Sequence, residues 1–349
     1  MGNFKVGVIG CGSIAQKRHL PEYQANENVE IVAVCDLVES RAEEMAQKYG
    51  AKAYTDYKEV LKLVEVDAIS VCLPNFLHAP VTIDALNEGK HVLCEKPMAV
   101  SSEEAQAMNQ AAQQNQKTLM IAHNQRFVSS HQKAKRIIES GDLGQIYSFR
   151  TTFGHGGPEN WSIDGASSWF FDKEKAFVGA MGDLGVHKAD LIRYLLGDVS
   201  EVGAFVQTSA KENTDVDDNA VCILKMDSGL IGTLTASWSY VSGNDNSTVI
   251  YGEKGMMELE NDPDYSLKVS YKNGESVHYS LDKIQTNEAG GQTTTHVIDH
   301  FVESVLNERP PLITGEEGMK SLQVILSALE ANETKQMIKV SSGNVSFST

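Results

Sequence analysis

The chain has 349 residues, and with 41% hydrophobic residues it can form two folded domains with sizeable cores. Its formal net charge of −17 disfavours nonspecific binding to nucleic acid or to an anionic membrane surface. No apolar segment approaches the roughly 18 residues of a membrane-spanning helix, and no signal-peptide pattern is present. We therefore expect a cytoplasmic protein with no nucleic-acid partner and no membrane partner.

The five cysteines show no C-x-x-C pair and no metal-binding spacing. They are interpreted as small buried residues of a reduced protein, and a catalytic thiol is the alternative. They are Cys11, Cys35, Cys72, Cys94 and Cys222.

The beginning of the chain carries the clearest motif. An apolar run at 4–9 predicts a buried strand, and Gly10-Cys11-Gly12-Ser13-Ile14-Ala15 follows it as G-x-G-x-x-A. The first glycine permits a tight turn, the second lets the backbone approach a pyrophosphate, and the small third residue lets the next helix pack closely. The N–H groups at the start of that helix attract phosphate oxygens. The motif predicts a dinucleotide-binding turn, with a helix from near Ser13 that is disturbed at Pro21.

An acidic residue follows the next predicted strand. Asp36 lies 21 residues after Ala15, where a carboxylate binds the ribose hydroxyls of NAD and repels the 2′-phosphate of NADP. The alternative role of Asp36 is a helix N-cap, and Arg41 nearby favours NADP. We expect NAD as the cofactor, with NADP as the alternative.

Strands alternate with helices up to residue 122, which predicts an α/β fold with a doubly wound parallel sheet. Ligands bind beyond the carboxyl ends of the strands in such sheets. We therefore expect the glycine turn, Asp36, Leu73-Pro74-Asn75, Glu95-Lys96-Pro97 and Asn124 to share one rim. The remaining predicted elements are strands at 30–35, 51–54, 68–73, 91–94 and 118–122 and helices at 38–49, 57–64, 78–87 and 101–114.

Lys96 is the most informative residue of this rim. It follows the strand at 91–94 and stands between Glu95 and Pro97. An ammonium group there can hydrogen-bond a substrate hydroxyl over the nicotinamide and stabilise a developing alkoxide. The alternative is a surface lysine ahead of a proline that starts a helix, and the tripeptide alone does not decide between them.

After about residue 122 the pattern changes to alternating segments separated by turn residues, which predicts a mostly antiparallel sheet. We expect a Rossmann domain at 1–123 and an α+β domain for substrate binding and oligomerisation at 124–349. The helix at 316–333 has an apolar stripe that can pack back on the first domain. The other predicted elements are a helix at 130–140 and strands at 145–153, 199–208, 220–226, 230–239, 248–252, 255–259 and 337–340.

The second half also holds a long connection at 154–177, in which His155, Trp161 and Trp169 stand among glycines and polar residues. Aromatic side chains can stack on the face of a sugar, and polar ones such as His155 can bind its hydroxyls. A connection of this length favours a functional loop. The alternative is a loop that its tryptophans pin to the core.

Asp183 and His187 form the second chemical pair. Their spacing of four places them on one face of a helix, where the carboxylate can orient the imidazole and raise its basicity. Histidine is well suited to taking a hydroxyl proton near neutral pH. The alternative is a structural Asp/His pair. No third ligand stands at a metal-binding spacing, so we expect no metal.

The order of these motifs resembles the glucose–fructose oxidoreductase / inositol dehydrogenase (Gfo/Idh/MocA) family over nearly the whole chain. One position departs from the family pattern G-G-x-x-x-D-x-x-x-H, in which Ala180 replaces the second glycine. The resemblance is carried by the glycine turn, Leu73-Pro74-Asn75 with His78, Gly89-Lys90-His91-Val92 leading into Glu95-Lys96-Pro97, Asn124-Gln125-Arg126-Phe127, and the segment Gly179 to His187.

The resemblance implies that Lys96 is catalytic, that His187 is the acid/base, and that Asp183 supports it or binds substrate. It also implies a homodimer or homotetramer through the open sheet. Cofactor contacts are expected from Gly10, Cys11, Gly12, Ser13, Ile14, Asp36, Arg41, Leu73, Pro74, Asn75, His78, Glu95, Lys96 and Asn124. Substrate contacts are expected from Lys96, Arg126, His155, Trp161, Asp183 and His187.

Together these features predict an NAD(P)-dependent oxidoreductase that acts on a sugar, a sugar derivative or a cyclitol. In this hypothesis His187 removes a hydroxyl proton while hydride passes to the nicotinamide, Lys96 stabilises the oxygen, and Asp183 fixes His187. Three alternatives stay open: a reductase of an anhydro-ketose or dicarbonyl, a non-enzymatic dinucleotide-binding regulator, and an NAD-dependent glycoside hydrolase.

Overall fold

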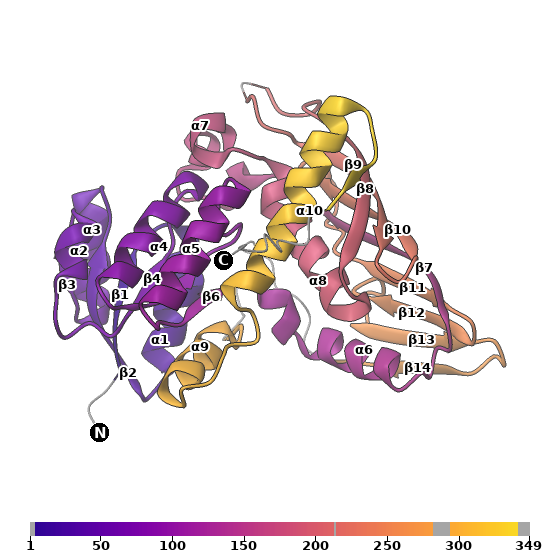
Figure 1. Ribbon diagram of the computed structural model, residues 1–349, viewed down its shortest axis with the longest axis horizontal. Coiled ribbons are helices and arrows are strands. Elements are labelled where there is room, and N and C mark those ends of the chain that lie inside the picture. Colours follow the sequence, from indigo (N-terminus) through magenta and orange to yellow (C-terminus); the bar gives the residue numbers. More distant parts are fainter. Residues whose placement is uncertain (1–3, 213, 282–293, 341–349) are drawn as a thin grey trace, which may run out of the picture.

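Two β-sheets organise the residues that the computed structural model describes, namely 4–212, 214–281 and 294–340 (Figure 1). The smaller sheet and its helices form one side of the molecule, and the larger sheet forms the other. The long helix α10 (Gly315–Thr334) runs between them (Figure 1).

The first sheet has six parallel strands in the order β3-β2-β1-β4-β5-β6, which confirms the predicted doubly wound sheet. The strand order reverses beside β1, between β1 and β4, and the carboxyl ends there are where such sheets bind ligands. The helix expected at 57–64 ends earlier, at Leu61. The strands are β1 (Phe4–Ile9), β2 (Val29–Cys35), β3 (Lys52–Tyr54), β4 (Ala68–Val71), β5 (His91–Cys94) and β6 (Leu119–Ile121), and the helices between β2 and β6 are α2 (Glu39–Tyr49), α3 (Tyr57–Leu61), α4 (His78–Asn87) and α5 (Ser102–Gln114).

The first crossover explains how the chain accommodates Pro21. A π-helical turn, η1 (Ala15–His19), comes first, and α1 (Leu20–Ala25) follows with Pro21 in its opening turn. The helix continues from η1 without a break, since the Leu20 N–H donates to the Ala15 carbonyl, and Pro21 lacks the N–H that would donate to the preceding turn. The sequence predicts that the first helix is disturbed at Pro21. In the structure the irregular part lies just before Pro21, as the π-helical turn η1.

The second sheet has nine strands in the order β14-β13-β12-β11-β7-β10-β9-β8-β15. Among the described strands only the central pair β7 and β10 is parallel, so the prediction of a mostly antiparallel sheet is confirmed. The strands are β7 (Ile146–Gly154), β8 (Val199–Gln207), β9 (Asn219–Met226), β10 (Ile231–Ser237), β11 (Thr248–Gly252), β12 (Gly255–Leu259), β13 (Leu267–Tyr271), β14 (Ser276–Tyr279) and β15 (Ile338–Lys339).

One face of this sheet is covered by helices and the other is open. The helices α6 (Ser129–Glu139) and α8 (Val186–Leu196) lie with α10 on the side towards the first sheet (Figure 1). Their apolar side chains share one core with the inward positions of the strands. On the opposite face large apolar side chains remain exposed, among them Phe205, Val221, Ile223 and Ile231.

The last helices return to the first core. The sequence analysis did not predict α9 (Val297–Leu306), whose Val297, Ile298, Phe301 and Val302 are buried among residues of the first sheet. Helix α10 contributes Leu322 to that core and other side chains to the second one. The packing of the helix at 316–333 against the first core agrees with the sequence-based expectation, whereas the contribution of α9 to that core was not predicted.

Candidate active site

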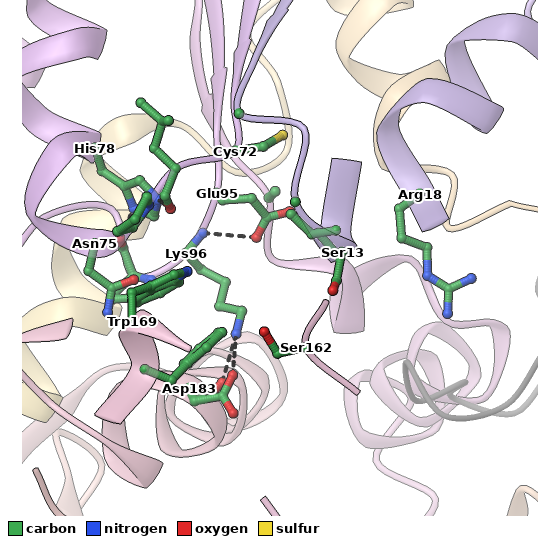
Figure 2. Close-up of a pocket in the computed structure, with 18 of the residues that line it drawn as sticks. Ser13, Arg18, Cys72, Asn75, His78, Glu95, Lys96, Ser162, Trp169 and Asp183 are labelled. Atoms are coloured by element: carbon green, nitrogen blue, oxygen red, sulfur yellow. Dashed lines mark hydrogen bonds and ion pairs between the residues drawn. The ribbon is translucent and has the colours of Figure 1, made fainter. Parts of the chain in front are cut away.

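A cavity of about 450 Å³ lies at the carboxyl ends of the first sheet's strands, and segments of the second half close it from the other side (Figure 2). The structure brings nearly all the nominated side chains to this cavity, and only Cys11 and Arg126 stay outside it. Those that line it are Gly10, Gly12, Ser13, Ile14, Asp36, Arg41, Leu73, Pro74, Asn75, His78, Glu95, Lys96, Asn124, His155, Trp161, Asp183 and His187.

The glycine turn has the shape that a dinucleotide requires. Gly10 has a φ of +93°, and a Cβ on it would lie 2.1 Å from the carbonyl oxygen of Cys72. At Gly12 a Cβ would meet no heavy atom within 4 Å, so the missing side chain leaves open space above the turn. The residues present therefore fit a pyrophosphate held against the backbone.

Cys11 serves this turn through its backbone. Its N–H donates to Asp36 Oδ2 at 2.9 Å, and its side chain is fully buried. Burial, with Asp36 as the next cause, raises the pKa of the Cys11 thiol to about 12. The thiol is therefore protonated and inert, and Cys11 contacts no ligand in this cavity with its side chain.

Asp36 is positioned for ribose hydroxyls. One of its oxygens accepts the Cys11 N–H and the other accepts the Val38 N–H, which leaves further acceptor capacity on both. The N-cap of α2 is Val38, so Asp36 does not act as that cap. Arg41 lies 3.6 Å from Asp36 and 2.9 Å from Asp164, so its guanidinium is shared between two carboxylates.

Lys96 connects the two halves of the molecule. Its Nζ donates to the backbone oxygen of Asp183 at 2.8 Å and to Asp183 Oδ1 at 3.1 Å (Figure 2). On the other side, Glu95 accepts the Lys96 N–H and bonds His19 at 2.9 Å. The ammonium group thus points into the cavity from the end of β5, and the surface-lysine alternative does not describe it.

Asp183 does not orient His187, which corrects the helical pairing expected from their spacing. Asp183 belongs to a π-helical turn, η7 (Met181–Gly185), that leads into α8, and Nδ1 of His187 has no hydrogen-bond partner among the described residues. Its carboxylate instead accepts from Lys96 and from Trp238 Nε1 at 3.1 Å, and it lies 4.0 Å from His155 Nε2. Trp238 has no local sequence signal because it comes from the end of β10, far along the chain.

Asp217 holds the start of that π-helical turn. Its carboxylate accepts the N–H groups of Gly179 and Met181 at 2.7 and 2.8 Å. These are among the first N–H groups of the helical segment, which have no partners inside it. Asp217 thereby holds the turn that carries Asp183 in place. Asp217 was not among the site residues predicted from the sequence.

His187 enters the cavity from α8 and is nearly buried. Burial lowers its pKa well below the ordinary value, and the nearby groups Lys96, His123 and Lys188 lower it further. The imidazole is therefore neutral at physiological pH and can accept a proton. Among the described residues its Nδ1 has no hydrogen-bond partner.

The long connection at 154–177 is hydrogen-bonded to the glycine turn, and several of its side chains line the cavity. Ser13 Oγ donates to the Trp161 carbonyl at 3.2 Å and accepts from the Ile163 N–H at 2.9 Å, so the connection lies against the glycine turn. Trp169 stacks on Phe170 at 3.9 Å between ring centroids. His155, Trp161, Trp169 and Phe170 all line the cavity, which gives it an aromatic wall.

Arg126 lies outside the cavity, so the structure does not support its expected substrate contact. Its guanidinium makes two hydrogen bonds to Asp190, at 2.7 and 2.8 Å, and one to Glu317 at 3.0 Å. This buried group bonds residues of α8 and α10.

Two further residues that line the cavity hydrogen-bond to backbone carbonyl groups around it. His78 bonds the carbonyl oxygens of Leu73 and Pro97, both at 2.7 Å, and so joins two rim segments. Asn75 donates to the Ala176 carbonyl at 2.8 Å, which links the rim to the end of the long connection.

The described residues contain no group of three His, Cys, Asp or Glu that could hold a metal ion. Across the same ranges, none of the helices is long and apolar enough to cross a membrane.

Comparisons with known proteins agree with this geometry. A family model described as "Oxidoreductase family, NAD-binding Rossmann fold" matches residues 4–123, and one described as "GFO/IDH/MocA C-terminal domain" matches residues 131–258. The chain is 29% identical to levoglucosan dehydrogenase of Pseudarthrobacter phenanthrenivorans over 83% of this chain and 82% of that protein. It is 30% identical to inositol 2-dehydrogenase of Salmonella typhimurium over 73% of each.

Among solved structures, levoglucosan dehydrogenase in complex with NADH and levoglucosan matches with a TM-score of 0.85. The two are 25% identical, and the match covers 97% of this chain and 99% of that one.

Proposed function

The chain belongs to the Gfo/Idh/MocA family and is an NAD-dependent oxidoreductase acting on alcohols, and we propose that its substrate is a secondary alcohol of a sugar, sugar derivative or cyclitol. One observation carries this proposal: Lys96 from the first domain and His187 from the second line the same cavity beside the dinucleotide turn. A donor cation and a neutral base are thereby available to a single substrate hydroxyl.

The chain's own residues supply binding and proton transfer. The glycine turn and Asp36 would hold the dinucleotide, and NAD bound there would supply the hydride acceptor. His187 takes the hydroxyl proton, since its neutral form is the stable one in this buried position. The Lys96 ammonium donates to the same oxygen and stabilises its developing charge. Asp183 acts on Lys96 rather than on His187, because its hydrogen bonds hold the ammonium in place.

The cavity wall supports a polyhydroxylated ring as the substrate. Trp161 and Phe170 pack edge to face at 5.0 Å, and such rings can cover the apolar face of a sugar. His155 stands beside Trp161 and offers a polar group to a neighbouring hydroxyl. The relatives named levoglucosan dehydrogenase and inositol 2-dehydrogenase support the same class of substrate. They also favour an enzyme over a non-enzymatic regulator.

The same residues can catalyse the reaction in either direction. A reductase of an anhydro-ketose or dicarbonyl would therefore use this site in the reverse direction. In that direction protonated His187 gives its proton to the carbonyl oxygen. A net change in NADH, formation by a dehydrogenase or consumption by a reductase, would distinguish both from a glycoside hydrolase that returns its hydride.

The experiment is nicotinamide absorbance with NAD and with NADP against a panel of cyclitols, aldoses and anhydrosugars, together with the corresponding ketones. We expect turnover of at least one ring substrate with NAD. Absence of turnover across the panel, with NAD binding shown separately by calorimetry, would contradict the proposed substrate class.

We further propose a homo-oligomer through the open face of the second sheet. Val221 and Ile223 alternate along β9 on that face, Phe205 pairs directly with Val221, and all three are exposed in a single chain. A second copy would remove these side chains from water. Light scattering should find a dimer or tetramer, Ile223→Glu should shift it towards monomer, and a monomeric native protein would contradict the proposal.

A further inference from the structure

His123 lies directly behind His187. It follows β6, its side chain is 1% exposed, and its ring packs edge to face on His187 with 6.4 Å between centroids. Neither ring nitrogen of His123 has a hydrogen-bond partner among the described residues, and neither has Nδ1 of His187. Buried polar atoms are seldom left without partners, so three such atoms on two touching rings call for an explanation.

To act as the base, His187 must carry its hydrogen on one particular ring nitrogen. A neutral imidazole accepts a proton only at the nitrogen that carries no hydrogen. If Nε2 is to accept from the substrate, Nδ1 must keep its hydrogen, and a hydrogen-bond acceptor at Nδ1 selects that tautomer. Asp183 is not that acceptor, because its carboxylate accepts from Lys96 and Trp238, and Nδ1 of His187 has no hydrogen-bond partner among the described residues.

Three charged or titratable groups act on His187 electrostatically: Lys96, His123 and Lys188. The two lysines are donors only, and both are committed elsewhere, Lys96 to Asp183 and Lys188 to the Asn246 carbonyl at 2.7 Å. His123 is thus the one member of this set that can accept a hydrogen bond. Burial lowers the pKa of His123 to about 4; Asp190 acts against this shift, whereas Arg126, Lys96 and Arg193 add to it, and the ring is therefore neutral.

At the observed separation the two rings are too far apart for a direct hydrogen bond between their nitrogens. A single water molecule spans such a gap and bonds well to both sides. We propose that His123 is a positioning residue that acts through one bridging water to hold His187 with its hydrogen on Nδ1, so that Nε2 takes the proton of the substrate hydroxyl. This inference rests on the proposed function, in which His187 is the base.

The proton balance follows directly. In the oxidation direction the substrate O–H bond breaks and its proton goes to Nε2. The carbinol C–H bond breaks as the C=O bond forms, and bound NAD would accept the hydride. The Nδ1 hydrogen stays on His187, bonded to the water and through it to His123. His187 is then cationic, and it returns to neutral by releasing the Nε2 proton to water entering the cavity after product leaves.

The test combines kinetics with the ring spectrum of His187. His123→Phe keeps the size and removes both nitrogens, His123→Asn restores a hydrogen-bonding group, and His131→Phe is the matched control. His131 is another fully buried histidine, bonded to the Gln125 carbonyl at 2.8 Å, and no ring contact joins it to His187. We expect His123→Phe to lose about 10- to 100-fold in kcat, with KM and the Kd of NAD unchanged. His123→Asn should recover most of that loss, and His131→Phe should keep the native kcat.

Nitrogen-15 NMR of the wild-type protein reads the tautomer without any change at His123, and His187→Gln assigns the signal. A hydrogen on Nδ1 supports the inference, and a hydrogen on Nε2 overturns it. Native kcat in a folded His123→Phe would also overturn it. If His187→Gln instead kept full turnover, the proposed function itself would fail. The kinetics of the two variants thus distinguish the positioning role of His123 from the role of His187 as the base.

Discussion

The Lys96 ammonium donates to both the backbone oxygen and the side chain of Asp183, at 2.8 and 3.1 Å, across the boundary between the two cores. These two hydrogen bonds join the end of β5 to the π-helical turn η7. The ammonium is thereby fixed before any substrate arrives, so that its charge needs little reorganisation during the reaction.

The first prediction concerns this ammonium. Lys96→Met should lower kcat by about 10²- to 10³-fold, because a donor to the developing alkoxide is lost. NAD binding should remain. Lys90→Met is the matched control, since Lys90 lies at the opposite end of the same strand and its Nζ donates to the Leu63 and Val66 carbonyls. It should lower the unfolding temperature and leave kcat unchanged, whereas equal kcat losses in both variants would contradict the role of Lys96.

The second prediction concerns the choice of cofactor. Asp36→Asn keeps an acceptor for one of the two N–H groups that the carboxylate binds, and it removes the charge that repels a 2′-phosphate. Arg41, relieved of one carboxylate, can then pair with that phosphate. We expect the ratio of kcat/KM for NAD over NADP to fall by at least about 10-fold, which corresponds to about 1.4 kcal/mol.

Asp164→Asn provides the control for that change. It frees Arg41 from its other partner and leaves Asp36 intact, so the preference for NAD should persist. If Asp164→Asn changed the ratio as much as Asp36→Asn does, the discrimination would come from Arg41 and not from the Asp36 carboxylate.

The third prediction concerns Trp238. Its Nε1–H donates to Asp183 Oδ2 inside the core, and Trp238→Phe leaves that oxygen without this partner. We expect a stability loss of about 1–3 kcal/mol from the unpaired buried group, measured by urea unfolding. Activity should fall as well, since Asp183 then holds Lys96 less firmly. Native kcat in Trp238→Phe would show that Asp183 needs no such support.

The fourth prediction concerns stability in acid. Burial, with Lys188 as the next cause, lowers the pKa of His131 to about 3, while its ordinary value is 6.5. Below pH 6.5 the unfolded chain therefore binds a proton at His131 that the folded protein does not bind. The stability from this residue is complete above pH 6.5 and is lost as the pH falls towards 3.

The slope of that loss is about 1.4 kcal/mol per pH unit for one histidine. His131→Phe should remove it, so that the unfolding free energies of variant and wild type converge as the pH is lowered from 7 to 5. Parallel curves over that range would mean that His131 is protonated in the folded protein.

Local chemistry explains which parts of the site the sequence could predict. The glycine turn and Asp36 follow from a strand, a turn and the next strand, all within the first 36 residues. The side chains on the rim follow from the rule that parallel strands end at one edge. Such features need no knowledge of distant contacts, and the structure brings them together.

Distant partners explain the remaining parts. Arg126 resembled a substrate contact, but Asp190 and Glu317, 64 and 191 residues further along the chain, take up its guanidinium. The spacing of Asp183 and His187 suggested a helical pair, but packing against Trp238 and capping by Asp217 accompany a π-helical turn. No periodicity in the sequence reports these contacts.

The role of His187 as the base is tested most directly by a single-turnover measurement. The protein is saturated with NAD and mixed with the substrate found in the panel, and NADH formation is followed at pH 7 in wild type and in His187→Gln. We expect the variant to bind NAD normally and to form NADH about 10²- to 10⁴-fold more slowly, with partial recovery at higher pH as hydroxide replaces the missing base. An unchanged rate of NADH formation in His187→Gln would contradict it.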